Sequence, residues 1–306
     1  MTTPSRLYFV TNRTFQSRLL LTPSPYVNNL VGGVIARALK RYDVALHAFV
    51  FLSNHCHLIV SSATGAVSEF MGYVEANIAK EVGRHIGWRG KLWHRRFSAE
   101  PILDDEALER RLAYIFGHGV KEGLVERASD WPGLNCIPEL CHNQRRLFPW
   151  FDRTAQYWAR LRGGKCDEAL FATWDPLVLT PPPAWQTLTA EQRAERARHI
   201  LEQAELQAVE ARGDKPPLGG AAVVAQDPHA VPSTTKRSPR PLCHASSRSA
   251  RDAFRALYRE FVAAYREASA LFRAGRIDAE FPDHCYKPPL PRSWCLASPP
   301  LAAVAL

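Results

Sequence analysis

Residues 45–62, ALHAFVFLSNHCHLIVSS, contain two apolar runs separated only by the pair Ser53-Asn54. Serine and asparagine side chains bond readily to nearby backbone groups, and such residues favour a tight turn. Apolar runs of this length on either side of a turn signal predict two buried strands, 45–52 and 55–62, paired as a hairpin.

The sequence on either side of this hairpin predicts further short elements in a regular order. We expect strands at 7–13 and 93–103 and helices at 24–42, 66–87 and 105–117. The acidic residues 104–106 stand at the start of the last helix, where they interact favourably with the helix dipole. The order β-α-β-β-α-β followed by a helix is the ferredoxin-like split βαβ pattern. Residues 1–135 are therefore predicted to form an α+β, RRM-like domain with an antiparallel sheet.

Composition divides the remaining chain into three parts. Residues 136–212 contain four tryptophans and a charged stretch with helical spacing, and they predict a packing segment followed by a helix. Residues 213–248 are rich in Pro, Ser and Ala, which is typical of a linker. Residues 249–306 predict a helix with an aromatic stripe, followed by a Pro-rich tail. The α+β domain is thus expected to carry a mostly helical, basic C-terminal extension.

The charge of the chain indicates the class of its partner. It carries a net charge of +9 over 306 residues, and 46% of its residues are hydrophobic. That hydrophobic fraction supports a sizeable core and excludes a wholly disordered protein. The excess of Lys and Arg favours a polyanionic partner such as nucleic acid, because these side chains displace counterions from phosphates.

Cysteine usage and hydropathy indicate the compartment. The seven cysteines are scattered and form no CxxC pair, which favours a reducing cytoplasm over a disulfide framework or a zinc knuckle. No stretch approaches the ~20 apolar residues of a membrane span, and the N-terminus has no apolar signal region. We therefore expect a cytoplasmic protein, associated with the nucleoid, that has no membrane partner.

Two histidines in the second strand of the hairpin are candidate metal ligands. Alternate side chains of a strand share a face, so His55 and His57 project together while Cys56 points to the other side. Imidazoles so placed can converge on one divalent cation, Mn²⁺ or Mg²⁺. The alternative is two ordinary histidines on a half-buried strand.

A second candidate pair lies in the predicted helix LERRLAYIFGHG. Tyr114 and His118 are four residues apart, so they occupy one helical face. His118 could add a third nitrogen to the metal, and the phenol of Tyr114 would then lie beside it. The alternative is a tyrosine that packs in the core.

A basic segment with interleaved aromatic rings precedes this helix. The cations Arg89, Lys91, Arg95 and Arg96 alternate with Trp88, Trp93 and Phe97. Cations for phosphates and rings for unpaired bases are what single-stranded DNA binding requires. The alternative places Trp93 and Phe97 in the core. Lys121 extends the predicted DNA-binding surface beyond the tyrosine helix.

Several motifs in unbroken order give the chain a family resemblance. The stretches YFVTNR, LHAFVFLSNHCHLIV, GKLWHRRF and YIFGHGVKEGLV, followed by DWP, resemble the REP-associated branch of the IS200-like tyrosine transposases over residues 6–135. These are single-strand DNA nucleases with a His-hydrophobic-His motif and one catalytic tyrosine. The resemblance implies His55 and His57 as metal ligands, a polar ligand at His118, and Tyr114 as the nucleophile.

The resemblance also implies an activity. A metal-dependent endonuclease and strand transferase would cut single-stranded DNA at hairpin-forming repeats through a 5′-phosphotyrosine, as a monomer or a homodimer. The chain departs from the family at Ser53, where Pro is usual, and at His118-Gly119, where Asn-Pro is usual. The alternative is therefore a decayed or domesticated DNA-binding regulator that keeps the fold without the chemistry.

Overall fold

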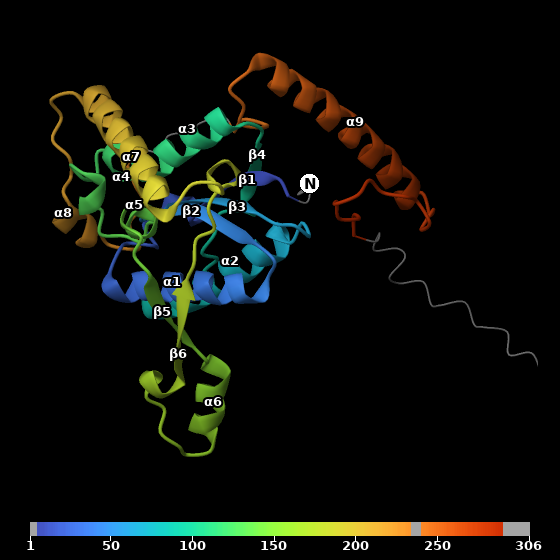
Figure 1. Ribbon diagram of the computed structural model, residues 1–306. Coiled ribbons are helices and arrows are strands. Elements are labelled where there is room, and N and C mark those ends of the chain that lie inside the picture. Colours follow the sequence, from blue (N-terminus) through green and yellow to red (C-terminus); the bar gives the residue numbers. More distant parts are fainter. Residues whose placement is uncertain (1–4, 234–239, 290–306) are drawn as a thin grey trace, which may run out of the picture. The chain divides into compact units, whose positions relative to one another are not determined.

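The computed structural model describes residues 5–233 and 240–289 (Figure 1). The end of the predicted Pro-rich tail, from residue 290, lies outside the described residues. The chain divides into two compact units, one formed by Pro4–Ser246 and the other by Met1–Thr3 with Ser247–Leu306. The division into four parts made from composition stays a prediction.

The larger unit is built on a four-stranded sheet in the order β2-β3-β1-β4. Its strands are β1 (Leu7–Arg13), β2 (Ala45–Phe51), β3 (His55–Ser61) and β4 (Ser98–Ile102). All three strand pairs are antiparallel. The backbone N–H of Leu52 donates to His55 O at 2.8 Å and closes the predicted hairpin turn. The α+β fold with an antiparallel sheet is thus confirmed.

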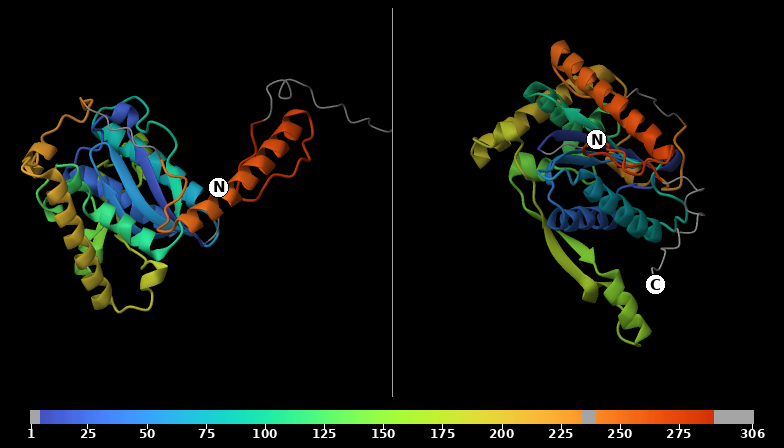
Figure 2. Two further views of the ribbon diagram at one scale, coloured as in Figure 1. Left: turned by 90° about the horizontal axis from the view of Figure 1, so that it is seen from above. Right: turned by 90° about the vertical axis from the view of Figure 1, so that its right-hand side faces the viewer.

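Helices cover both faces of this sheet. Figures 1 and 2 show α1 (Pro25–Arg41) and α2 (Val67–His85) on one face and α3 (Asp105–Phe116) on the other. Side-chain caps begin α1 and α3, because Ser24 accepts from Val27 N and Asp104 accepts from Ala107 N. The first predicted helices therefore form close to their expected bounds.

The strand predicted at 93–103 is shorter than expected. Only Ser98–Ile102 pair as β4, and Trp93 makes an isolated bridge to Thr14. The chain leaves α2 through Gly87, whose φ of 68° lies in the left-handed region, and runs as a loop to residue 97. The alternation of residue types in this loop resembles a strand, but in the described residues its backbone pairs with the end of β1 only around Trp93, so no continuous ladder forms.

Three further helices pack behind α3. They are α4 (His118–Lys121), α5 (Ile137–His142) and α7 (Ala190–Arg212). The buried face of α7 consists of alanines and Ile200, and these small side chains let α7 lie close against the other three helices. Together these helices hold the end of α3 in place above β3.

The segment predicted as a linker contains regular contacts. It includes α8 (Gly220–Val224), and the N–H groups of Leu218 and Gly219 donate to Gly123 O and Leu124 O at 2.9 Å. Further along, His244 bridges Ile102 in parallel at the free edge of β4. Composition alone does not indicate these backbone hydrogen bonds.

A two-stranded ribbon extends from α1. It is formed by β5 (Arg146–Phe151) and β6 (Ala172–Leu177), with α6 (Arg153–Leu161) between them. The ribbon crosses α1 where the helix has two glycines. A Cβ on Gly33 would lie 1.9 Å from Pro149 O, so only glycine permits this approach.

The smaller unit contains α9 (Arg248–Arg273), close to the helix predicted at 249–274. Its C-terminal half packs against the chain that follows, since the rings of Phe272 and Phe281 lie 5.8 Å apart. Within the described ranges, no helix has both the length and the apolar character that a membrane span requires.

Candidate active site

The register of the sheet places the two histidines of β3 on the face that α3 covers. His55 pairs with Arg13 and His57 pairs with Thr11 across the β3–β1 ladder. Cys56 points to the opposite face, where burial raises the pKa of its thiol. The predicted alternation along this strand is therefore present in the structure.

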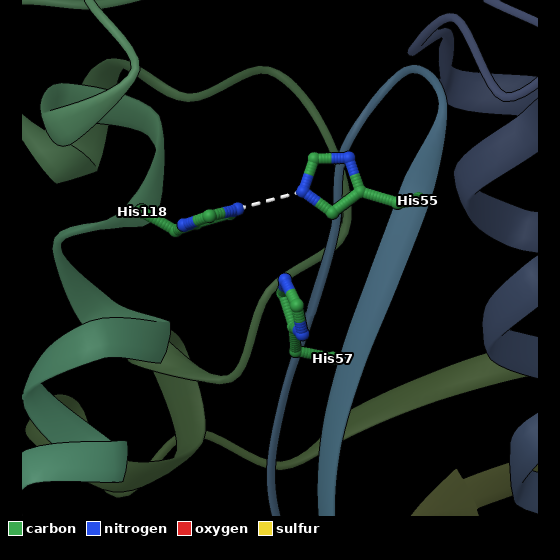
Figure 3. A group of neighbouring side chains, drawn as sticks. All are labelled: His55, His57 and His118. Carbon is green, nitrogen blue, oxygen red and sulfur yellow. Dashed lines mark hydrogen bonds between the residues drawn. The ribbon is translucent and has the colours of Figure 1, made fainter. Parts of the chain in front are cut away.

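His118 completes a buried cluster of three imidazoles. It begins α4, directly after α3 ends, and its Nε2 lies 2.7 Å from Nε2 of His55. One ring nitrogen of each of the three histidines lies within 4.8 Å of the others. Figure 3 shows the rings of His55 and His57, from one strand, facing that of His118 from the opposite side. All three side chains are buried.

Hydrogen bonds orient two of the rings toward the centre of this cluster. His55 Nδ1–H donates to Asn54 Oδ1 at 2.6 Å, and Nδ1 of His57 lies 2.9 Å from Thr11 Oγ1. Each ring therefore directs its Nε2 at the other histidines, and because His55 donates from Nδ1, the lone pair of its own Nε2 faces them. Nε2 of His57 is buried and has no hydrogen-bond partner among the described residues.

The cluster has the properties of a metal site. Burial lowers the pKa of His55 to about 3 and holds the pKa of His57 well below its ordinary value, so both rings are neutral at pH 7. Neutral imidazoles with convergent lone pairs bind a divalent transition metal well. An orphaned, buried Nε2 on His57 is accounted for by such an ion. The residues present therefore fit a divalent cation.

Tyr114 lies beside the three histidines. Its ring centroid is 4.6 Å from that of His118 and 5.2 Å from that of His57. Burial raises the pKa of Tyr114, and the carboxylate of Glu122 adds to this effect, whereas the charge of Arg111 opposes it. The phenol is thus protonated at neutral pH and adjoins the candidate metal site.

Two cations lie over the ring of Tyr114. Lys121 Nζ is 4.4 Å from its centroid, and the guanidinium of Arg111 is 5.1 Å from it. Arg111 is half-buried and makes no hydrogen bond or ion pair within the described parts of the chain. Lys121 was predicted to lie at this surface. Arg111 was not, although its position three residues before Tyr114 places it on the same helical face.

Sequence reasoning also missed a polar pair that, like Tyr114, contacts Phe9. His244 Nε2 lies 3.8 Å from Glu100 Oε2, and both side chains are nearly buried. The rings of His244 and Tyr114 each meet the ring of Phe9 at its edge. Nothing in the local pattern around His244 predicts this placement, because the bridge between His244 and Ile102 at the edge of β4 creates it.

The predicted DNA-binding cations of the loop before β4 are exposed. They are Arg89, Lys91, Arg95 and Arg96. Trp93 is half-buried, packs against the core, and donates its Nε1–H to Glu75 O at 2.9 Å. In the described ranges, Arg89, Lys91 and Arg95 make no contact with the three histidines or Tyr114. The loop thus forms a basic, exposed surface.

Comparisons with known proteins match part of the chain. Residues 13–118 match the sequence profile of a family described as "Transposase IS200 like". No curated protein matches the chain. The matched residues include β3, Tyr114 and His118.

Two solved structures are similar to part of the chain. One is a REP-associated tyrosine transposase bound to a REP hairpin, which is 19% identical and covers 46% of this chain and 81% of that chain, with a TM-score of 0.40. The other, provisionally described as a transposase of Deinococcus radiodurans R1, is 14% identical and covers 35% and 84%, with a TM-score of 0.29.

Proposed function

We propose that this chain, whose residues 13–118 match the profile of IS200-like transposases, is a metal-dependent endonuclease and strand transferase that acts on single-stranded DNA. The observation that carries the proposal is the position of Tyr114 against three buried, converging histidines. A phenol packed only as core has no need of a neutral imidazole cluster on one side and two cations over its ring.

The proposed metal ligands are His55, His57 and His118, which would hold Mn²⁺ or Mg²⁺. Bound there, the cation would polarise a phosphate and offset the negative charge that develops on it. Asn54 and Thr11 would keep the rings of His55 and His57 in the binding orientation.

Tyr114 would act as the nucleophile. Its Oη forms a bond to phosphorus while the bond from phosphorus to the 3′ oxygen breaks, which yields a 5′-phosphotyrosine and a free 3′-OH. The phenol loses one proton and the departing oxygen takes one up. Because the phosphodiester energy is kept in the covalent link, another 3′-OH can reverse the step and join a new strand.

Two sets of cations would hold the DNA. Arg111 and Lys121 adjoin Tyr114 and would contact the phosphates next to the cut. Arg89, Lys91, Arg95 and Arg96 would contact the strand further away, on a loop that Trp93 anchors to the core. Hairpin-forming repeats are the target that the family resemblance implies.

A covalent-adduct experiment tests this function. Wild-type protein is incubated with a labelled single-stranded hairpin and Mn²⁺, and adducts that survive denaturing electrophoresis are counted. We expect an adduct with wild type, none with Tyr114→Phe or His57→Ala, and none in EDTA. Tyr73→Phe, which changes a half-buried tyrosine on α2, is the matched control and should react as wild type.

The outcomes of this experiment distinguish a nuclease from a DNA-binding regulator. Tyr114→Phe keeps the ring and its packing, so this variant should still bind the hairpin in a mobility-shift assay. A wild-type protein that binds the hairpin and forms no adduct with either metal would instead be the DNA-binding regulator, and the proposed chemistry would be wrong.

A further inference from the structure

Residues 146–177, which we call the arm, have a tip that no part of the proposed active site uses. The arm consists of β5, α6 and β6, and its tip is residues 157–165, YWARLRGGK. Figures 1 and 2 show the arm projecting from α1, on the side of the sheet away from α3. Tyr114 lies on α3, so the tip lies far outside the active site.

The base of the arm is held firmly in place. Phe148 and Pro149 lie against the two glycines of α1. Arg153 Nε donates to Glu81 Oε2 on α2 at 2.8 Å, and the ring of Trp150 stacks on Tyr73 at 6.0 Å. Because an ion pair, ring stacking and close backbone contact anchor the arm, its tip has a defined position.

Large apolar side chains at this tip face solvent. The exposed fractions are 56% for Tyr157, 52% for Trp158 and 58% for Leu161. No residue of α6 is buried, so the helix contributes nothing to the core. A contiguous exposed set of this kind, rich in aromatic rings, marks a surface that binds a partner.

The charges of the tip are all positive and unpaired. Arg160, Arg162 and Lys165 are exposed and make no side-chain hydrogen bond or ion pair within residues 5–233 and 240–289. The acids of the arm are engaged elsewhere: Asp152 and Asp167 accept from backbone N–H groups, Glu168 pairs with Arg153, and Asp175 pairs with Arg37 and Lys40.

We propose that the tip of the arm binds single-stranded nucleic acid, and that it holds DNA outside the strand bound at Tyr114. Bases would stack on Tyr157 and Trp158, and the three cations would contact phosphates. A second copy of the chain is disfavoured as the occupant. A twofold contact places the same patch on itself and would bring six unpaired cations together.

Fluorescence anisotropy with a labelled dT₂₀ oligonucleotide, which forms no hairpin, tests the proposal. We expect Trp158→Ala to weaken binding about tenfold and Trp158→Phe to restore most of it. A triple Gln variant of Arg160, Arg162 and Lys165 should lower the slope of log affinity against log salt by about 2. Arg110→Gln, which removes an exposed cation of α3, is the control and should leave both values unchanged.

Two results would overturn the proposal. One is binding of dT₂₀ by the triple variant with the affinity and salt slope of wild type. The other is a concentration-dependent dimer in sedimentation that Trp158→Ala abolishes, which would make the tip an interface between copies. A separate experiment tests the proposed function, and it measures adduct formation on a hairpin without flanking bases. An absent adduct with wild-type protein would refute that function and leave the dT₂₀ result intact.

Discussion

At the scale of single residues, the site depends on which nitrogen of each imidazole is engaged. Asn54 Oδ1 accepts a hydrogen bond from Nδ1–H of His55, and Thr11 Oγ1 makes a hydrogen bond with Nδ1 of His57. Both partners lie outside the candidate ligand set, yet they decide that Nε2 faces the cluster. Hydrogen-bond partners of this kind orient metal-bound histidines in general, and their loss weakens metal binding.

Asn54→Ala is therefore expected to weaken Mn²⁺ binding about 10- to 100-fold. Without the Oδ1 acceptor, the ring of His55 can turn or take the other tautomer. Calorimetric titration with Mn²⁺ measures the change. Asn77→Ala removes an amide that bonds to Tyr73 O within α2, and it should bind the metal as wild type does. Equal affinities for the two variants would contradict the role of Asn54.

Replacing Arg111 is expected to lower activity without lowering stability. A half-buried guanidinium without an ion pair costs folding free energy, and it is positioned to hold a phosphate beside Tyr114. Arg111→Gln should lower the rate of adduct formation about 10- to 100-fold and leave the free energy of unfolding equal or higher. Arg111→Lys should recover part of the rate. Single-turnover kinetics and urea unfolding measure the two effects, and a loss of stability would argue for a structural role.

At the scale of elements, the contact between β1 and α2 contains a half-buried carboxyl. Asn12 Nδ2 donates to Glu75 Oε1 at 2.6 Å, on the sheet face opposite the histidines. Burial raises the pKa of Glu75 from 4.5 to about 7, although the hydrogen bond from Asn12 opposes the shift. The folded protein thus keeps this proton to a higher pH than the unfolded chain does.

The sign of the pH dependence follows from that difference. The contribution of Glu75 to stability is fully present below pH 4.5 and is lost as the pH rises to about 7. Glu75→Gln keeps the acceptor oxygen and removes the charge, so it should stabilise the protein at pH 8 by about 1–2 kcal/mol, after allowance for solvent screening. At pH 5 the gain should be small. Urea unfolding at both pH values measures it, with the exposed Glu202→Gln as control.

At the scale of the whole molecule, the boundary between the two units falls just after a segment that belongs to the sheet. Leu103 N donates to His244 O and His244 N donates to Pro101 O, at 2.9 and 2.8 Å. Ser246 N donates to Asp104, the residue that caps α3. The first unit therefore ends at Ser246, after these contacts.

Two truncations test this boundary. A chain that ends at Ser246 should fold and unfold cooperatively with nearly the stability of the larger unit in the full chain. A chain that ends at residue 239 loses the three hydrogen bonds that His244 and Ser246 make next to β4 and at the start of α3. It should therefore be less stable by about 1–3 kcal/mol. Urea unfolding followed by circular dichroism measures both. Equal stability of the two truncated chains would show that the edge segment contributes nothing.

The local sequence pattern was sufficient to predict most helices and strands and the placement of part of the candidate site. The alternation in β3 places His55 and His57 on one face, and helical spacing places Tyr114 next to His118, because both periods are set by backbone geometry. The hairpin, the order of strands and helices, and α9 follow from the same kind of signal. The metal and nucleophile roles of these residues stay predictions.

The contacts between distant segments required the folded chain. His118 meets His55 across 63 positions, and Thr11 reaches His57 through the β1–β3 register. His244 reaches Phe9 and Glu100 through a bridge at the edge of β4, and the arm forms because glycines in α1 let a ribbon cross it. Such contacts depend on register and on close packing between elements. Register and close packing produce no periodic pattern in the sequence. A short polar or Pro-rich stretch has the same composition whether it lies in a linker or along a sheet.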